Sequence, residues 1–269
     1  MCFTLELNSG MCFNNKDSVH SMNNQAVLNI THLGDFLSMK TTIQEFHLLS
    51  QVYSDVQQRF QQIDDPAHGW EHVQRVYNLA LFIAEREGAD GFITGMAALL
   101  HDLGRLSHEH GQHHADLSVS EAAALCQQLR IAPHSQEAIL HAILAHSFSR
   151  GVQPRTLEAC IVRDADRLDG LGAIGVMRWA ITGAVRHTPQ TLCYHPDDPF
   201  AEKHEADDSR YMLDHFFSKL LRLSEGMTTT TGRELAEQRT AFMRSYLNEF
   251  RRELAVGPGP DAPPLQDSL

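Results

Sequence analysis

Apolar side chains recur every three or four residues along most of the chain, the spacing of one face of an α-helix. The first run, residues 43–63, has these apolar positions: Ile43, Phe46, Leu49, Val52, Tyr53, Val56, Phe60 and Ile63. A second run covers residues 73–84 and can end at Gly88, and a third covers residues 93–100, before Gly104. No stretch alternates apolar and polar residues with the period of a β-strand. The pattern therefore predicts an all-α fold.

Six further helices are predicted over residues 119–130, 134–147, 156–165, 170–186, 209–223 and 232–254. The Asp-Pro pair at 65–66 predicts the start of the second helix, with an N-cap followed by a proline in the first turn. Segments 118–121 and 231–234 have the Ser/Thr-x-x-Glu form of a capping box, which marks a helix start.

The two ends of the chain differ from the helical part. Residues 1–38 are polar and rich in Asn, and they lack the apolar stretch of a secretory signal. We interpret them as a disordered tail or an upstream extension of the reading frame. Residues 256–269 are rich in Pro and Gly, which predicts a second disordered tail. One domain is therefore expected over residues 39–255.

Composition limits the function classes. The 269 residues are 42% hydrophobic, and 22 Lys and Arg stand against 34 Asp and Glu, for a formal charge of −12. This charge argues against duplex nucleic acid as a partner, because phosphate neutralisation needs a basic surface. A small phosphorylated substrate stays open, since a bound cation can reverse the local field. No apolar run has the ~20 residues of a membrane helix. The five widely spaced cysteines predict a reducing, cytoplasmic location.

Histidine is over-represented, with 17 copies, and several lie at expected helix ends. His72 follows His68 at a spacing that brings both to one helix face, with Arg75 nearby. His101-Asp102 ends an apolar run, where a buried Asp needs a cation or a hydrogen-bond donor. Taken alone, the first pair also fits a surface helix, and the second also fits a buried His–Asp hydrogen bond.

Three acids follow a core-facing apolar segment at Asp164, Asp166 and Asp169, a pattern that a solvated helix face does not explain. His141 and His146 lie on another core-facing segment, with His146 at its end. Imidazole and carboxylate ligands in this mixture suit Mn²⁺, Fe²⁺, Mg²⁺ or Zn²⁺ better than a thiolate zinc site.

The ordered set His72, His101-Asp102 and Asp166 resembles the H…HD…D signature of HD-domain metal-dependent phosphohydrolases. Over about residues 40–252 the chain is also similar to the YedJ/YpgQ-like bacterial subgroup, in these stretches: 72–76, 146–149, 164–175, 198–200, 214–216, 219–221 and 231–236. The resemblance implies an all-α HD-domain bundle with a metal in its core. It implies the four residues of the signature as ligands and Mn²⁺ as the preferred ion.

The subgroup implies hydrolysis of nucleoside triphosphates, preferably deoxy, to monophosphate and pyrophosphate by a metal-activated water. Asp102 and Asp166 are expected to bridge the metal and its water, and His146 or His141 to move protons. His141 also fits a satisfied, partly buried histidine. Rival interpretations are a phosphomonoesterase, a phosphodiesterase, or a non-catalytic nucleotide-binding module.

Four further side chains are candidate substrate contacts: Arg75, Arg105, His108 and Lys219. Arg75 also fits a structural pair with a site carboxylate, and Lys219 a surface position. His108 lies near the position at which relatives often carry a lysine, and it belongs to a His-rich segment that we interpret as a mobile loop. The sequence leaves the oligomeric state open.

Overall fold

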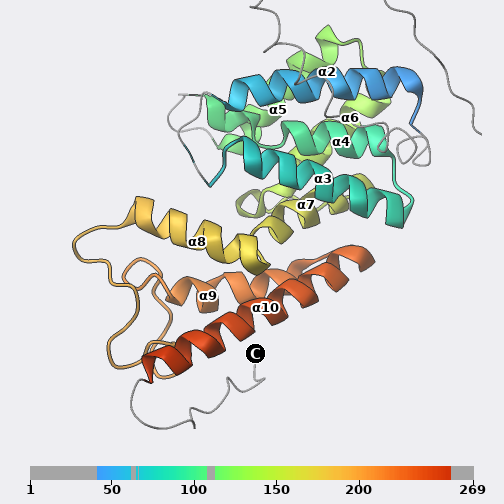
Figure 1. The fold of residues 1–269 in the computed structure, drawn as a ribbon. Coiled ribbons are helices and arrows are strands. Elements are labelled where there is room, and N and C mark those ends of the chain that lie inside the picture. Colours follow the sequence, from blue (N-terminus) through green and yellow to red (C-terminus); the bar gives the residue numbers. More distant parts are fainter. Residues whose placement is uncertain (1–40, 62–64, 66, 108–112, 256–269) are drawn as a thin grey trace, which may run out of the picture.

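The computed structural model describes residues 41–61, 65, 67–107 and 113–255 (Figure 1). These residues form nine α-helices: α2 (Ile43–Phe60), α3 (Trp70–Glu87), α4 (Gly91–Leu100), α5 (His114–Gln128), α6 (Pro133–His146), α7 (Leu157–Asp169), α8 (Gly172–Arg186), α9 (Asp214–Ser218) and α10 (Thr230–Leu254). Three 3-10 helices are η1 (Leu103–Leu106), η2 (Phe148–Arg150) and η3 (Leu220–Gly226). Within these ranges there is no strand, so the predicted all-α fold is confirmed. None of the described helices is long and apolar enough to cross a membrane.

The helices form two groups, α2 to α7 and α8 to α10, which occupy the upper and lower halves of Figure 1. The first group packs around α4, all ten residues of which are buried. Helices α3, α6 and α7 surround it, and α2 covers its outer side. In the second group, α10 packs along α8 and also contacts α7. The two predicted tails lie outside the described residues.

The predicted helices agree with the observed ones to within a few residues, with one exception. The segment predicted as a helix over 209–223 contains the short α9 and then η3. Lys219 separates the two, with φ −140° and ψ −60°, outside the helical region. The side chain of Lys219 therefore leaves the backbone at a break between two helices.

The predicted start of α3 at Asp65 is wrong. Asp65 Oδ1 accepts hydrogen bonds from the backbone N–H groups of Ala67 at 2.9 Å and His68 at 3.1 Å, which closes a turn before the helix. Helix α3 begins at Trp70, and Gly69 is its N-cap. Short polar side chains that bond the local backbone compete with helix formation, which explains the delayed start. The predicted end at Gly88 is confirmed, with φ +73°.

The helix starts predicted from the two capping boxes, at 118–121 and 231–234, are also wrong. Helix α5 begins four residues before Ser118, with His113 as N-cap, and the Ser118 hydroxyl accepts from Gly104 N–H at 2.9 Å instead. For α10, the cap is Thr229, whose Oγ1 accepts from Gly232 N–H at 2.9 Å. In both cases a side chain two to five residues earlier satisfies the exposed N–H groups of the first turn.

Gly104 does not terminate α4, which ends at Leu100, but lies within η1. A Cβ atom at this position would approach the His114 carbonyl oxygen to 2.1 Å. Only glycine allows η1 and α5 to pack this closely. The contact brings the start of α5 next to the end of α4.

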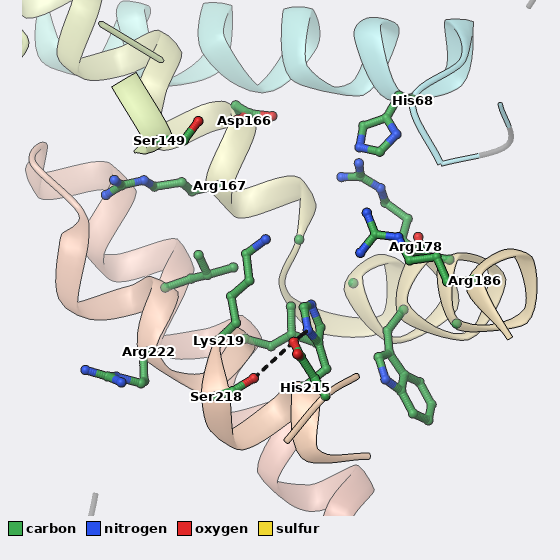
Figure 2. A pocket seen from close by; sticks show the side chains of 18 of the residues that line it. His68, Ser149, Asp166, Arg167, Arg178, Arg186, His215, Ser218, Lys219 and Arg222 are labelled. Carbon is green, nitrogen blue, oxygen red and sulfur yellow. Dashed lines mark hydrogen bonds and ion pairs between the residues drawn. The ribbon is translucent and has the colours of Figure 1, made fainter. Parts of the chain in front are cut away.

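A cleft of about 1290 Å³ lies between the two groups of helices. One side is lined by residues of the first group, including Asp102, His146 and Asp166, and the other by residues of α8, α9 and η3. Figure 2 shows Asp166 on the first side, with Lys219 extending into the cleft from the second. The fold thus places the ends of three core helices opposite a wall that is rich in cationic side chains.

Candidate metal centre

Four side chains from three regions of the chain meet at the floor of the cleft. His72 lies in the first turn of α3, His101 caps the C-terminus of α4, Asp102 follows it, and Asp166 lies in the last turn of α7. The side chains of His72, His101 and Asp102 are at most 3% exposed. Asp166 is 29% exposed and faces the opening.

The ligating atoms of these residues converge. The Nε2 atoms of His72 and His101 are 3.4 Å apart, and His72 Nε2 is 3.4 Å from Asp166 Oδ1 and 3.7 Å from Asp102 Oδ2. His101 Nε2 lies 3.7 Å from Asp102 Oδ2 and 3.9 Å from Asp166 Oδ1. Ligand atoms about 2.0–2.2 Å from one ion lie about 3.0–3.5 Å from their neighbours. The ligand atoms of His72, His101 and Asp102 all lie within 4.8 Å of one another, so this group could hold a divalent cation. Asp166 Oδ1 lies beside the two histidines and is a candidate fourth ligand.

Each histidine of this group is oriented through its other ring nitrogen. His101 Nδ1 lies 2.8 Å from the carbonyl oxygen of Ala98, and His72 Nδ1 lies 2.7 Å from Asp169 Oδ2. Both partners are acceptors, so each Nδ1 carries a proton and the Nε2 of His101 presents a lone pair. The Nε2 of His72 faces Asp166, which favours a proton there, and it presents a lone pair once that proton has left. Two lone pairs and two carboxylate oxygens then face one another, and a cation satisfies all of them.

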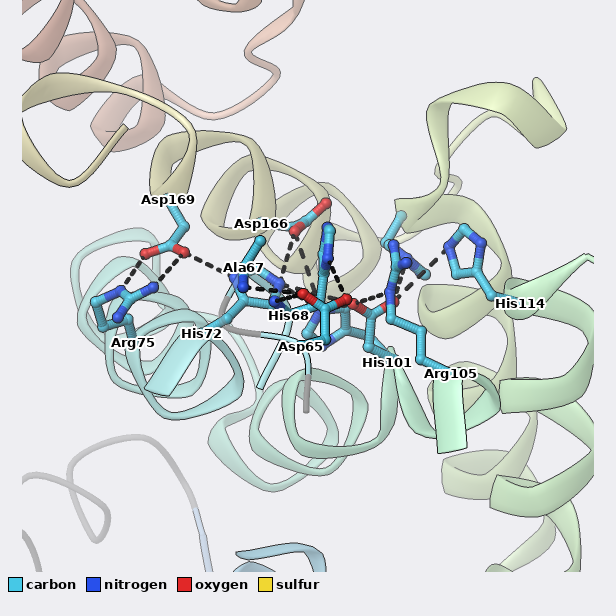
Figure 3. Close-up of polar contacts among 12 residues, drawn as sticks. Asp65, Ala67, His68, His72, Arg75, His101, Arg105, His114, Asp166 and Asp169 are labelled. Atoms are coloured by element: carbon cyan, nitrogen blue, oxygen red, sulfur yellow. Dashed lines mark hydrogen bonds and ion pairs between the residues drawn. The ribbon is translucent and has the colours of Figure 1, made fainter. Parts of the chain in front are cut away.

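Asp169 connects His72 to two arginines, as Figure 3 shows in part. Arg75 binds both oxygens of this carboxylate, at 2.6 and 3.0 Å, and Arg178 Nη1 lies 2.7 Å from Oδ2. Carboxylates that bond a ligating histidine fix its ring and increase its basicity. Asp169 therefore positions His72, and the two arginines position Asp169.

The protonation states suit a cation. Burial lowers the pKa of His101 to about 4, which keeps this ring neutral at pH 7. Burial opposes ionisation of Asp102, but His101 and Arg105 hold the pKa of Asp102 below its usual range. Hydrogen bonding to His72 likewise outweighs burial and holds the pKa of Asp166 well below its usual range. Metal ligands must be neutral imidazoles and ionised carboxylates. His101, Asp102 and Asp166 take these forms, whereas the hydrogen bonds of His72 to Asp166 and Asp169 outweigh burial and raise the pKa of His72, so a cation would displace a proton from this ring.

A second group shares Asp102. Its other oxygen, Oδ1, is 3.7 Å from His114 Nε2 and 3.8 Å from His146 Nε2, and it has no hydrogen-bond partner among the described residues. His146 Nδ1 donates to the Ile143 carbonyl oxygen at 2.5 Å, so its Nε2 also presents a lone pair. No local pattern distinguishes His114 from the other histidines of its segment. The contact at Gly104 is what brings it to Asp102.

The His68 side chain lines the cleft beside the four ligands, and its role is missed by sequence reasoning. Its Nδ1 lies 2.9 Å from Asp65 Oδ2, and Asp65 also holds the backbone of this turn. Burial and the charge of Arg105 lower the pKa of His68. The Asp65-x-x-His68 spacing is the feature of the sequence that could indicate this turn, but the Asp-Pro pair there predicts a helix start instead.

Comparison with known proteins agrees with this geometry. Residues 69–171 match the family model of the HD domain, and this range contains all four candidate ligands. Protein YpgQ of Bacillus subtilis is 36% identical over 204 residues, which cover 74% of this chain and 89% of YpgQ. The chain belongs to the HD-domain family of metal-dependent phosphohydrolases.

Solved structures of HD-domain proteins share the fold. The crystal structure of Bacillus subtilis YpgQ in complex with ADP has a TM-score of 0.61 and 32% identity, covering 82% of this chain and 100% of YpgQ. An HD-superfamily hydrolase from Bacillus thuringiensis has a TM-score of 0.63 and 28% identity, covering 79% of this chain and 100% of that protein. The predicted relationship to the family is confirmed.

The other candidate site residues of this HD domain lie in different places. Arg105 lines the cleft and bonds Asp102 Oδ2 through Nε at 2.6 Å, and Lys219 lines the opposite wall. Arg75 bonds Asp169 and does not line the cleft. His141 is not brought to the metal centre; its Nε2 accepts from the Arg155 backbone N–H at 2.9 Å, beside a separate pocket. His108 lies outside the described residues.

Proposed function

We propose that this protein hydrolyses nucleoside triphosphates, deoxy forms preferentially, to the nucleoside monophosphate and pyrophosphate. The observation that carries the proposal is the convergence of His72, His101, Asp102 and Asp166 on one point at the floor of a cationic cleft. The cleft is cationic although the chain has a net charge of −12. The ADP complex of YpgQ supports a nucleotide as the ligand.

These four residues would hold a divalent cation, with Mn²⁺ preferred and Mg²⁺, Fe²⁺ or Zn²⁺ as other candidates. When bound, such an ion lowers the pKa of a coordinated water and neutralises charge on a phosphoryl group. His101 is already neutral and Asp102 already ionised, so the ion would displace a proton only from His72, whose hydrogen bonds to Asp166 and Asp169 raise its pKa.

In the proposed reaction, the oxygen of water bonds to the α-phosphorus, and the bond from that phosphorus to the β-phosphate oxygen breaks. Pyrophosphate leaves, and the water proton needs an acceptor. His146 is suitable, because its Nδ1 donates to the Ile143 carbonyl oxygen and its Nε2 is therefore free to accept. Arg105, 2.6 Å from Asp102 through Nε, is placed to neutralise charge on the α-phosphate.

The second ligand group favours one other candidate function. Two ions that share Asp102 would make a two-metal site, which is common in phosphomonoesterases and phosphodiesterases. In that case His114 and His146 would be ligands of the second ion. His146 would then not be available as a proton acceptor.

Product analysis in ¹⁸O-labelled water tests the proposal. The full chain with Mn²⁺ is incubated with dNTPs, NTPs, dNMPs and cyclic nucleotides, and orthophosphate and pyrophosphate are measured separately. We expect pyrophosphate from triphosphates, with the label in the monophosphate. Orthophosphate as the first product, or turnover of monophosphates or cyclic nucleotides alone, would reject the pyrophosphohydrolase and favour the two-metal candidate.

A further inference from the structure

The cations that line the cleft differ in whether the protein already uses them. Arg105 is paired with Asp102 and Arg178 with Asp169, at 2.6 and 2.7 Å. Arg167 donates to the Gly226 carbonyl oxygen at 2.5 Å. Each of these guanidinium groups already has a partner in the protein, and of the three only Arg105 is bonded to a residue of the metal centre. A ligand that extends beyond the metal centre therefore needs other cations.

Arg186 and Lys219 are the cations that remain on the wall formed by α8, α9 and η3. Both line the cleft, and neither side chain makes a hydrogen bond or ion pair with any of the described residues. The side chain of Arg222 also lines the cleft without a bonded partner among the described residues, but Figure 2 shows it directed away from Lys219. In the same view Lys219 extends its ammonium group into the cleft between Arg167 and Arg178.

The charges of these two residues act on the same region. Burial lowers the pKa of His215 on α9 against the opposing hydrogen bond to Asp208, and the positive charges of Lys219 and Arg186 both add to the lowering. The nearest acid, Asp208, already accepts from His215 Nδ1 at 2.6 Å and Ser218 Oγ at 3.3 Å. Glu225 also lines the cleft and is exposed. Two cations that converge without a bonded acid create a local field that attracts an anion.

The position of Arg186 along α8 separates this region from the metal centre. Arg178 reaches Asp169, which bonds the ligand His72. Arg186 is eight residues later on the same helix, about 12 Å further along the axis at 1.5 Å per residue. A ligand held at the four metal-binding residues has to extend along the cleft to reach Arg186.

We propose that Arg186 and Lys219 form a second anion subsite, which binds the β- and γ-phosphates of the substrate while the α-phosphate lies at the metal centre. The orientation rests on the proposed function. The subsite itself rests on the unpaired cations. With this subsite, the protein recognises the number of phosphates on the nucleotide rather than its base. A monophosphate at the metal centre does not extend to Arg186.

The test is the binding of inorganic pyrophosphate to the full chain, measured by calorimetry with Mn²⁺ and again in EDTA. Lys219→Gln and Arg186→Gln should each weaken pyrophosphate binding about tenfold, because each removes a charge-assisted hydrogen bond. The same variants should change inhibition by dAMP less than about twofold. Lys203→Gln is the matched control: Lys203 is the other lysine of the described residues, is exposed, and does not line the cleft.

The outcomes separate the subsite from the proposed reaction. Pyrophosphate binding that depends on Lys219 and Arg186, in a protein that hydrolyses no triphosphate, would support the subsite and reject the reaction. Triphosphate hydrolysis with unchanged KM and unchanged pyrophosphate binding in both variants would reject the subsite and leave the reaction. Equal weakening by Lys203→Gln would reject the subsite as well, since the effect would then follow net charge alone.

Discussion

Helices α4 and α8 lead to opposite sides of the cleft, and they differ in how much of each is buried. All ten residues of α4 are buried, whereas α8 buries only Gly172 and Gly175 among its fifteen. Met177 and Val185 of α8 are 61% and 72% exposed. Close packing fixes the side chains at the end of α4, where His101 and Asp102 lie, whereas α8 packs against α10 through fewer buried positions and leaves more of its side chains in solvent. The metal centre is therefore on the more buried side of the cleft and the proposed phosphate wall on the more exposed side.

The polar groups show the same contrast. On the metal side the charged groups around His72 are bonded to one another, in the chain from His72 through Asp169 to Arg75 and Arg178. On the α8 side Arg186 and Lys219 have none among the described residues. Partnered groups hold a fixed geometry, which a metal requires. Unpartnered cations keep their charge available to a ligand that arrives from solution.

The largest expected effect is the loss of the metal centre in Asp102→Ala. Asp102 supplies one oxygen to each ligand group, so its removal affects both. We expect metal content to fall to background and hydrolysis to fall more than about a thousandfold, since metal activation of water is lost. The stabilisation of about 2.7 kcal/mol that a metal at 100 times its Kd gives wild-type protein should also be lost. Elemental analysis and melting temperature with and without EDTA measure both effects.

Asp116→Ala is the matched control for this variant. Asp116 is an exposed acid on α5, paired with Arg150 at 3.1 Å on the surface. Its loss should leave metal content and the EDTA-dependent change in melting temperature as in wild type. If Asp102→Ala retains full metal content, Asp102 is not a ligand and the centre has been placed wrongly.

The second effect compares the two helices directly. Leu99 of α4 is fully buried, and Leu99→Ala should lower the free energy of unfolding by about 2–5 kcal/mol through lost burial and a cavity. Met177→Ala on α8 should change it by no more than about 0.5 kcal/mol. Urea denaturation of both variants gives the two values. Similar losses would mean that α8 packs against something in solution, and the contrast between the two sides would fail.

The extent of burial also explains which parts of the fold the sequence predicts. The period of apolar residues predicts α4 and α7 well, because burial requires that period. Helix starts were predicted less well, since Ser, Thr and Asp can bond several nearby backbone groups. Asp65 closes a turn and Ser118 bonds Gly104 from within α5, and neither choice is visible in the local pattern.

For the site, the H…HD…D signature predicts the candidate ligands, but it does not predict the residues that support them. His72 and Asp169 are separated by 97 positions, and only the packing of α3 against α7 reveals their bond. His114 reaches Asp102 because glycine at 104 allows α5 to approach, a feature that has no local signature. Arg178 and Arg186 were missed because an exposed arginine on an amphipathic helix looks the same whether it faces a cleft or bulk solvent.

A smaller effect is expected when a ligand is kept but its support is weakened. Asp169→Asn removes the charge that bonds His72 Nδ1 and leaves Arg75 and Arg178 without their carboxylate. Loss of such a supporting carboxylate typically costs 10- to 100-fold in metal affinity, so we expect about that range for Mn²⁺. Competition with a calibrated chelator measures the affinity. Asp208 is an acid on the opposite wall, and Asp208→Asn should leave the Mn²⁺ affinity unchanged. An unchanged Mn²⁺ affinity in Asp169→Asn would show that His72 needs no support from Asp169.

The smallest effect concerns how the second group of helices is held together. His204 lies between two carboxylates, 2.7 Å from Asp198 Oδ2 and 2.8 Å from Asp214 Oδ2. Its hydrogen bonds to Asp198 and Asp214 raise the pKa of His204. A raised pKa means that the folded state binds the proton more tightly than the unfolded state does. The stabilisation is therefore complete below the unfolded pKa of about 6.5 and is lost as pH rises through the folded value.

The melting temperature of wild-type protein minus that of His204→Gln should accordingly be larger at pH 6 than at pH 8.5. Asp198 does not contribute in this window, because its hydrogen bonds outweigh burial and lower its pKa to about 2, and its stabilisation is lost only in strong acid. Titration at the metal centre is common to both proteins and cancels in the difference. A difference that stays constant with pH would show that folding leaves the pKa of His204 unchanged. The loop before α9 would then be held by its backbone bonds to residues 192–193 rather than by a charged clamp.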